Sequence, residues 1–504
     1  MKRPNIASAL PAVRCLGALI MLLGAGAAQA DRCAGLIKAF GNQLADLSCV
    51  DSADLTTANP ATTPANNSLP GLPPFAFTPQ TDRATIAPDA ANRPPITAPV
   101  PGVQLNARIA SDPTGQARFL LRLPAKWNGR LVVAGASGTR SEFNGDFAWS
   151  DYVVQKGYAY ASQNKGVLNL KFSDASDPLA CRLNPTSPLW VQFYDNGPGQ
   201  EFTRWRDYMV LASKLAHKGA AANYGKSPRY TYAVGTSNGA YQVRRAVESA
   251  PDWFDGGVDW EGTFVDENAP NLLTDLPAAI LNYPDYVASG MSSTSTAAKN
   301  IRGAGYPPDL GTGATSLWAM NSASFWEVTL CQWQKRLDPT YDTYGSGPEN
   351  YNYFARLPVS NADDNIADFA TTGRIQRPLI TVAGTMDALL PIDHHARAYA
   401  RKVAANGGER INDDGHHRRK HHHHRDRNPA YRLYEVQNGN HIETYKLTLP
   451  QLEFIQPHAQ RAFDLLVSHV EQGKALPPDQ CIGRGDAIAD APAQPGHCAE
   501  LLAP

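Results

Sequence analysis

Residues 230–241 read YTYAVGTSNGAY and carry the most informative local pattern of the chain. A run rich in β-forming residues leads into Gly-x-Ser-x-Gly at 235–239, and residues 242–248 continue with helical spacing. A serine on a tight strand-to-helix turn needs small neighbours, because strand and helix approach closely there. The pattern predicts that Ser237 is a nucleophile at the amino end of a helix, where developing negative charge is stabilised. A structural turn with an idle serine is the alternative, because the pattern alone is weak in a chain with 40 glycines.

Mostly apolar runs elsewhere in the chain have the length of strands and are bounded by Gly, Pro or Asn; they lie at 119–123, 131–135, 158–162 and 379–384. Continuous apolar runs are typical of strands buried on both faces. Between them, residues 205–216 have the spacing of a helix. Alternating strands and helices predict an α/β protein with a mostly parallel central sheet and helices on both faces. Together with the serine turn, this is the pattern of the α/β-hydrolase fold.

The serine hydroxyl needs a base within hydrogen-bond reach, and a carboxylate must hold that base in one tautomer. In this fold the acid and then the histidine follow the serine along the chain. Asp387 follows the apolar run at 379–384, and His441 follows a second strand candidate at 431–436. We therefore expect Ser237, Asp387 and His441 to meet at the carboxyl ends of neighbouring strands.

Other residues compete for the roles of acid and base. Asp393, His394 and His395 lie in the helical region expected after Asp387 and are rival candidates. The tetrahedral intermediate also needs N–H donors, which we expect from the backbone of Asn238 and from the loop 135–138, at Ala136. The remaining histidines fall in helical or tail positions, where surface or packing roles are simpler: His217, His458, His469 and His497.

Composition divides the chain into segments. Residues 1–30 carry basic residues, a short apolar run and an Ala-Gln-Ala end, as a secretory signal does, with an uncleaved anchor as the alternative. The protein is therefore expected to be exported, to the periplasm or out of the cell, without stable membrane insertion. The segments that follow are a Pro/Thr-rich arm at 31–103, the first half of the core at 104–263, a lid at 264–374, the second half of the core at 375–475 and a tail with a disulfide at 476–504.

The lid is expected because the alternation of strands and helices fails between 264 and 374. Such an insertion would cover the carboxyl edge of the sheet, where α/β folds bind ligands. A structural insertion without substrate contact is the alternative.

The charge balance bears on the class of partner, and the cysteine count bears on the compartment of the protein. The 46 basic and 47 acidic side chains leave a formal net charge of −1, so nothing favours nucleic acid as a partner. Of the 7 cysteines, Cys15 lies in the predicted signal, and the others form an even set that fits an oxidising compartment. Proximity suggests the pairs Cys33–Cys49 and Cys481–Cys498, which leaves Cys181 with Cys331, although sequence alone cannot choose among the possible connectivities.

A histidine-rich run lies at 416–427, between the acid and the base. We interpret it as a solvated loop with incidental metal binding, because it lacks cysteine and ordered spacing. No metal and no cofactor is predicted as a requirement.

Several further stretches resemble the tannase and feruloyl esterase family of secreted α/β-hydrolases: residues 123–130, 156–162, 224–225 with the serine turn, and 250–256. With the Asp387 and His441 segments, the resemblance spans most of residues 105–475. It implies a serine esterase with a Ser-His-Asp triad and a large lid between the serine and the acid. Members commonly carry a cysteine before the serine and another after the histidine, where this chain has Thr236 and Ile442. The calcium loop of that family is not clearly matched by Asp363, Asp364 and Asp368.

More distantly, the chain resembles secreted hydrolases of 3-hydroxybutyrate oligomers, which share the serine turn and the late histidine. We therefore expect a carboxylic ester hydrolase that acts on a small-molecule or oligomeric ester through an acyl-enzyme. A tannase-like or feruloyl esterase-like substrate is the first expectation, and hydroxybutyrate oligomers or related polyester fragments are the alternative. An inactive binding protein on a hydrolase scaffold and a serine peptidase with the same triad are the other hypotheses.

Overall fold

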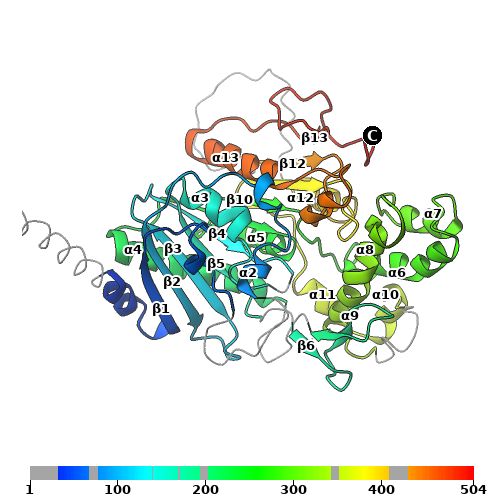
Figure 1. Ribbon diagram of the computed structural model, residues 1–504, viewed down its shortest axis with the longest axis horizontal. Helices are drawn as coiled ribbons and strands as arrows, with labels where there is room; N and C mark the ends of the chain where they lie inside the picture. The colour runs from blue at the N-terminus through cyan, green and yellow to red at the C-terminus, as the bar shows by residue number, and fades with distance from the viewer. Residues whose placement is uncertain are drawn as a thin grey trace, which may run out of the picture.

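The computed structural model describes residues 32–66, 78–138, 140–167, 171–192, 202–341, 351–407 and 429–504. The predicted signal at 1–30 and the histidine-rich run at 416–427 lie outside the described residues. Figure 1 shows a central sheet flanked by helices, with a second group of helices beside it. Among the helices described, none combines the length and the apolar character needed to cross a membrane.

One sheet of ten strands forms the centre of the molecule. Neighbours from β5 to β13 pair in parallel, whereas β1, β2, β3 and β5 pair antiparallel. With antiparallel strands at one end and β5 inserted before β4, this is the sheet of an α/β-hydrolase, so the predicted fold class is confirmed. The order across the sheet is β1 (Leu44–Ser52), β2 (Gly102–Ile109), β3 (Arg118–Pro124), β5 (Ala159–Gln163), β4 (Arg130–Gly135), β9 (Tyr230–Thr236), β10 (Gly256–Trp260), β11 (Leu379–Gly384), β12 (Tyr431–Val436) and β13 (Gln480–Ile482).

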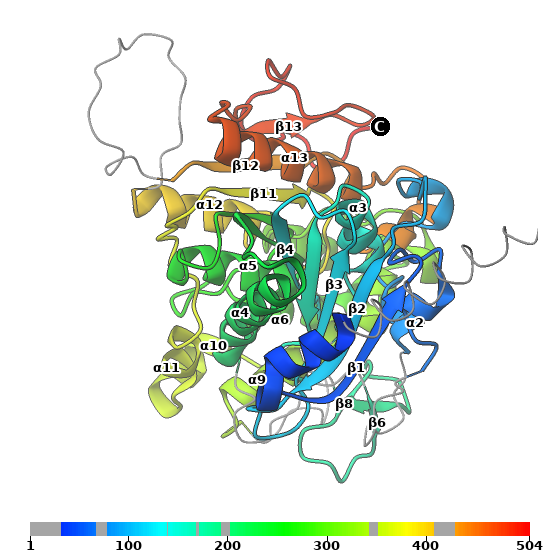
Figure 2. The ribbon, with the colours of Figure 1, turned by 90° about the vertical axis from the view of Figure 1, so that its left-hand side faces the viewer.

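Both faces of the sheet are buried by helices. In β4, Leu131 and Val133 join the core on the side of α4, α5 and α12, whereas Val132 and Ala134 pack on the side of α3 and α13. Figure 2 shows these two sets of helices on opposite sides of the sheet. Burial on both faces explains the nearly continuous apolar runs of the inner strands. The helices are α3 (Asp151–Val154), α4 (Arg204–Tyr224), α5 (Asn238–Ser249), α12 (Ala396–Ala405) and α13 (Gln456–Gln472).

The sheet is wider than the sequence predicts, because both flanking segments add a strand. β1 lies in the predicted arm and pairs with β2, with Cys49 opposite Leu105. β13 lies in the predicted tail and pairs with β12. β1 is an edge strand whose side chains alternate in burial, so it lacks the continuous apolar run of the inner strands. The 3 residues of β13 are too few to show any period.

Residues 264–374, called the lid segment below, form the second group of helices, to the right of the sheet in Figure 1. Their aromatic side chains, which include Trp318, Trp326 and Trp333, pack into a core cluster together with Trp205 of α4 and Tyr241 of α5. This cluster also takes in Leu389 and Leu390 from the turn after β11, so it reaches the carboxyl edge of the sheet. The helices are α6 (Leu272–Ala288), α7 (Thr296–Gly303), α8 (Leu317–Ser324), α9 (Trp326–Leu337), α10 (Tyr353–Arg356) and α11 (Ala362–Ala367).

Three disulfides join neighbouring parts of the fold. Between β5 and α4 lies a small sheet in the order β6 (Lys171–Ser173), β8 (Trp190–Gln192) and β7 (Cys181–Arg182). The Cys181–Cys331 bond ties this small sheet to α9 of the lid segment. Cys33–Cys49 anchors the residues before β1, and Cys481–Cys498 closes the tail. The two pairs that proximity suggested are present, as is the pair that remained, so the predicted pairing is confirmed.

Candidate active site

Ser237 occupies the turn between β9 and α5, where its backbone has φ 57° and ψ −125°. A positive φ is unfavourable for a residue with a Cβ, and strain of this kind is typical of a nucleophile elbow. The nearby glycines are needed for close approach, because a Cβ on Gly239 would lie 2.5 Å from the carbonyl oxygen of Gly135. The Ser237 N–H donates to the carbonyl of Trp260 at 3.0 Å, which ties the turn to β10.

His441 and Asp387 lie on adjacent turns and form a buried hydrogen bond. Asp387 follows β11 and His441 follows β12, and Nδ1 of His441 lies 2.8 Å from Oδ2 of Asp387. The other oxygen of Asp387, Oδ1, accepts the backbone N–H groups of Leu389 at 2.8 Å and Leu390 at 2.7 Å. A carboxylate fixed in this way can hold the ring in the tautomer that carries its proton on Nδ1.

Electrostatics around His441 favour the charged form of its ring. Burial lowers the pKa of the imidazole, but the charge and hydrogen bond of Asp387, with a further contribution from Glu261, outweigh the effect of burial. The pKa of His441 is raised from 6.5 to about 9. The neutral ring that a general base requires is therefore favoured at alkaline pH.

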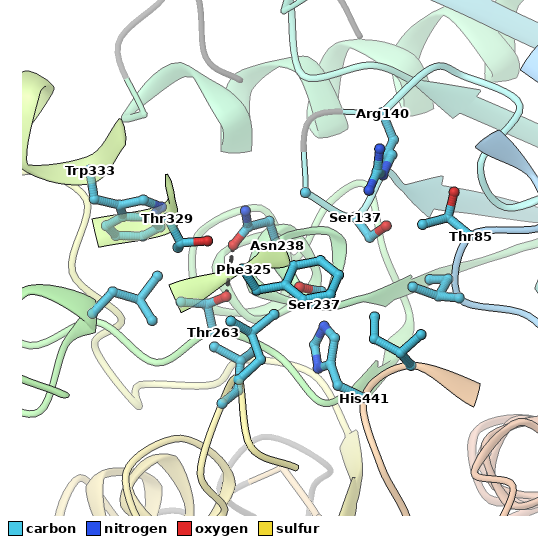
Figure 3. Close-up of a pocket in the computed structure, with 16 residues that line it drawn as sticks. Thr85, Ser137, Arg140, Ser237, Asn238, Thr263, Phe325, Thr329, Trp333 and His441 are labelled. Atoms are coloured by element: carbon cyan, nitrogen blue, oxygen red, sulfur yellow. Dashed lines mark hydrogen bonds between the residues drawn. The ribbon is translucent and has the colours of Figure 1, made fainter. Parts of the chain in front are cut away.

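Ser237 and His441 line the same pocket, and Figure 3 shows the imidazole pointing toward the serine. Within the described part of the chain, no hydrogen bond joins the Ser237 hydroxyl to the ring. Such contacts are often long in ligand-free hydrolases and tighten when substrate binds. The structure thus brings the three predicted residues to one place, with the hydrogen bond between acid and base already formed.

The rival acid and base candidates lie elsewhere. Asp393 has a side chain that is 47% exposed, and it pairs with Arg397 at 3.1 Å. His394 and His395 face Asp275 of α6, with ring nitrogens 3.0 Å and 3.4 Å from its carboxylate oxygens. None of these side chains is among the described residues that line the pocket. The same holds for His217, His458, His469 and His497.

A second acid, which the sequence analysis missed, contacts the same histidine. Glu261 follows β10 directly, is 3% exposed, and has its Oε2 3.5 Å from Nδ1 of His441. Its Oε1 accepts the backbone N–H of Gly384 at 3.0 Å. Burial raises the pKa of Glu261 well above its usual value, and the charge of Asp387 adds to the rise. The signal that could have found Glu261 is an acid directly after a short strand, although Asp259 interrupts the apolar character of β10.

One set of side chains is close enough to hold a metal ion. Among the described residues, Glu261, Asp387 and His441 are the one such set, with ligand atoms within 4.8 Å of one another. A cation there would compete with the hydrogen bond between Asp387 and His441, because Nδ1 carries the proton that Asp387 accepts. These side chains fit an acid–base pair better than a metal site. The expected absence of a required metal or cofactor stays a prediction.

Backbone N–H groups near Ser237 come from Asn238 and from the loop after β4. Asn238 is the first residue of α5 and lines the pocket. In the loop, Ser137 and Gly138 line the pocket, whereas Ala136 is not among the lining residues. The N–H of Ser137 donates to Oδ1 of Asn144 at 3.1 Å. The loop reaches the pocket through the residues that follow Ala136, and an N–H donor at Ala136 stays a prediction.

A buried lysine, which the sequence analysis did not identify, supports this loop. Nζ of Lys165 donates to the carbonyl oxygens of Ala136 at 2.5 Å and Ser137 at 3.2 Å. Burial lowers the pKa of its amine well below the usual value. Lys165 therefore fixes the position of the loop without reaching the pocket itself.

The pocket walls are mostly apolar, with hydroxyl groups and one cation. Among the described lining residues, Arg140 is the one permanently charged side chain, and it pairs with Asp82 at 3.5 Å. Figure 3 shows Arg140 on the same side of the pocket as Ser137 and Thr85. The lid segment and the arm both contribute to the lining, which includes Leu272, Phe325, Thr329 and Trp333 from the lid segment and Thr85 and Ile86 from the arm.

Residues 501–503 contact the turns that carry the acid and the base. Asn438, shortly before His441, donates its Nδ2 to the carbonyl of Ala503 at 2.9 Å and accepts the Ala503 N–H on Oδ1 at 2.7 Å. Thr385, shortly before Asp387, donates its hydroxyl to the carbonyl of Leu501. Both turns are thus held by the same short segment.

Known proteins match the part of the chain that contains the acid and the base. A family model described as 3HB-oligomer hydrolase matches residues 359–494, which include Asp387 and His441 but not Ser237. The D-(-)-3-hydroxybutyrate oligomer hydrolase of Burkholderia thailandensis is 31% identical over 137 residues, 26% of this chain and 17% of that protein. The protein of the same description from Burkholderia mallei is 32% identical over 124 residues, 23% of this chain and 15% of that protein. The chain thus spans less than a fifth of the length of these relatives, and the predicted resemblance to them is confirmed over this stretch.

Solved structures of esterases are similar over most of the chain. The likeness to feruloyl esterase B from Aspergillus oryzae covers 86% of this chain and 88% of that chain, with a TM-score of 0.48 and 14% identity. The likeness to tannin acyl hydrolase from Aspergillus niger covers 82% of this chain and 89% of that chain, with a TM-score of 0.43 and 12% identity. An ester hydrolase is the enzyme class that the family match supports.

Proposed function

We propose that this chain is an exported serine hydrolase that cleaves carboxylic esters, with Ser237 as nucleophile, His441 as base and Asp387 as its partner. The observation that carries the proposal is the 2.8 Å contact between His441 and Asp387, beside a pocket that His441 shares with the strained Ser237. A buried acid–base pair facing a serine at a helix amino end is the arrangement that acyl transfer requires.

In the proposed mechanism, Asp387 holds the Nδ1 proton of His441, so Nε2 is free to take the proton of the Ser237 hydroxyl. The serine oxygen then attacks the ester carbonyl, and the Asn238 N–H with a second N–H from the loop 136–138 stabilises the oxyanion. The imidazolium returns the proton to the leaving alcohol, which leaves an acyl group on Ser237. Water, activated by the same ring, then releases the acid and restores the serine.

Two features support export. The sequence of residues 1–30 has the organisation of a secretory signal. Three disulfides, Cys33–Cys49, Cys181–Cys331 and Cys481–Cys498, are bonds that persist in oxidising compartments and are rare in the cytosol.

Hydroxybutyrate oligomers are the substrate class that we favour over gallate or ferulate esters. The family model that matches residues 359–494 is described as 3HB-oligomer hydrolase, and the relatives from Burkholderia carry a description of the same kind. An oligomer of a hydroxy acid ends in a free carboxylate, and Arg140 on the pocket wall offers a cation that can pair with it. The aromatic side chains of Phe325 and Trp333 in the same pocket support the phenolic alternative.

The proposal is tested by a hydrolysis panel with the purified protein. The panel comprises hydroxybutyrate dimer and trimer, methyl gallate, methyl ferulate, p-nitrophenyl butyrate and a matched anilide. We expect ester cleavage with the highest kcat/KM for the oligomers, little anilide cleavage, and covalent labelling of Ser237 by a fluorophosphonate, located by peptide mass. Absence of both labelling and turnover would favour the inactive binding protein, and efficient anilide cleavage would favour a peptidase.

A further inference from the structure

Two neighbouring parallel strands each present an acid to the same histidine. β10 and β11 are paired in register, with Trp260 opposite Val382, and Glu261 is the residue that follows β10. The Glu261 N–H donates to the carbonyl of Val382 at 2.9 Å, and its Oε1 accepts the N–H of Gly384 at 3.0 Å. The glutamate is therefore fixed by the strand that leads to Asp387.

The second oxygen of Glu261 is aimed at the histidine. Oε2 lies 3.5 Å from Nδ1 of His441, and it is buried without a hydrogen-bond partner among the described residues. The backbone of Glu261 has φ 52°, a region that favours glycine, and strained backbone of this kind clusters at active sites. A buried polar atom without a partner is unfavourable, so a structural role alone does not account for this carboxyl.

We propose that Glu261 is a positioning residue for His441, which shares the Nδ1 proton with Asp387 and takes over the role of the acid when Asp387 carries no charge. The inference rests on the proposed function, because it concerns the same base. Asp387 is the nearer partner, at 2.8 Å against 3.5 Å, so it orients the ring in the unmodified protein.

Charge coupling between the two acids explains how the exchange works. Two buried carboxyl groups this close do not both ionise readily. Burial and the charge of Asp387 raise the pKa of Glu261, with a smaller rise from Glu443, while the charge of His441 opposes them. An amide in place of Asp387 removes one of these causes. The pKa of Glu261 then falls, and its ionised carboxylate can hold the Nδ1 proton of His441.

The test is a double-mutant cycle with Asp387→Asn, Glu261→Gln and the double variant. Asp393→Asn is the matched control, an acid-to-amide exchange at a half-exposed position outside the pocket. In triads with a single acid, the corresponding amide lowers kcat by about 10⁴-fold. Because Glu261 can replace Asp387, we expect kcat to fall by roughly 10²-fold in Asp387→Asn and by about 10⁴-fold only in the double variant.

The pH profile separates positioning from a merely structural role. In Asp387→Asn, an ionised Glu261 still raises the pKa of His441, so the ascending limb of kcat/KM should have its midpoint at higher pH than in the double variant. A structural defect would lower kcat/KM without moving the midpoint of its ascending limb. The proposal would be overturned if Asp387→Asn and the double variant had equal kcat/KM values and equal midpoints of the pH profile.

A spectroscopic measurement makes the proposal independent of turnover and of the folding of the double variant. The Nδ1 proton of His441 should give a low-field ¹H NMR resonance, which we expect to persist in Asp387→Asn because Glu261 accepts the proton. Loss of that resonance in a folded Asp387→Asn protein would overturn the proposal. The proposed function fails separately, if Ser237→Ala hydrolyses esters as fast as the unmodified protein.

Discussion

In the parallel sheet, the acids and the nucleophile follow strand ends: Ser237 comes directly after β9, Glu261 directly after β10 and Asp387 shortly after β11. In the lid segment, the pocket-lining residues come from α6, from α9 and from Phe325 just before α9. Backbone hydrogen bonds between strands fix the first group, whereas side-chain packing and one disulfide position the second. The reaction should therefore depend on single atoms at strand ends, while the lid segment should affect stability and substrate choice.

The largest effect is expected at the end of β9. Ser237→Ala removes the nucleophile, so kcat for a p-nitrophenyl ester should fall by about 10⁶-fold. The thermal unfolding midpoint should stay close to that of the unmodified protein, because only one oxygen is lost. Ser137→Ala, at another serine of the same pocket, is the matched control and should lose far less activity. A similar fall in kcat in both variants would contradict the statement that the reaction depends on the residue at the end of β9 more than on the surrounding loops.

The next largest effect concerns the covalent bond of the lid segment. Cys181→Ala with Cys331→Ala should lower the free energy of unfolding by about 2–4 kcal/mol, because the bond closes a long segment in the unfolded chain. The measurement is urea unfolding followed by circular dichroism, with kcat determined on the folded protein. Cys33→Ala with Cys49→Ala is the control; its bond spans 16 residues instead of 150, so the loss should be smaller. A large fall in kcat of the folded Cys181→Ala, Cys331→Ala protein would show that the lid segment takes part in the chemistry.

A smaller effect follows from the raised pKa of His441. The base must be neutral, so kcat/KM should rise with pH through a midpoint at about pH 9, and fall about tenfold for each unit below it. The same shift stabilises the folded protein below pH 6.5, and this contribution is lost as pH rises through about 9. Profiles of kcat/KM and of the urea midpoint across this range check both statements. A kinetic midpoint near 6.5 would mean that the strand-end carboxyls do not act on the ring as the structure indicates.

The smallest effect distinguishes two walls of the pocket. Arg140→Gln should lower kcat/KM for a hydroxybutyrate dimer about tenfold relative to p-nitrophenyl butyrate, because a charge-assisted contact of about 1.5 kcal/mol is lost. Phe325→Ala, from the lid segment, should lower kcat/KM for both esters to a similar extent, because apolar contact does not depend on the carboxylate. Kinetics of the two variants with the two esters give the comparison. An equal response of both esters to Arg140→Gln would contradict a carboxylate-binding role.

Chain order and local pattern were enough to predict the α/β-hydrolase sheet. They were also enough to predict that Ser237, Asp387 and His441 lie close together. These predictions depend on strands that are recognisable from their apolar runs, and on the fixed order of nucleophile, acid and base along the chain. Glu261 was missed because it stands after β10, a strand with polar Asp259 in its middle that no pattern singled out. Lys165 and the lining residues of the lid segment were missed because their roles depend on packing between distant segments, which carries no period in the sequence.

The contacts of residues 501–503 with the turns before Asp387 and His441 have a practical consequence for handling the protein. Trimming these residues, or forcing them away with a bulky fusion, would loosen the acid and the base together although the serine turn stays whole. A preparation altered there could therefore still react slowly with a fluorophosphonate and yet turn over poorly, so affinity tags should not be placed beside residue 503.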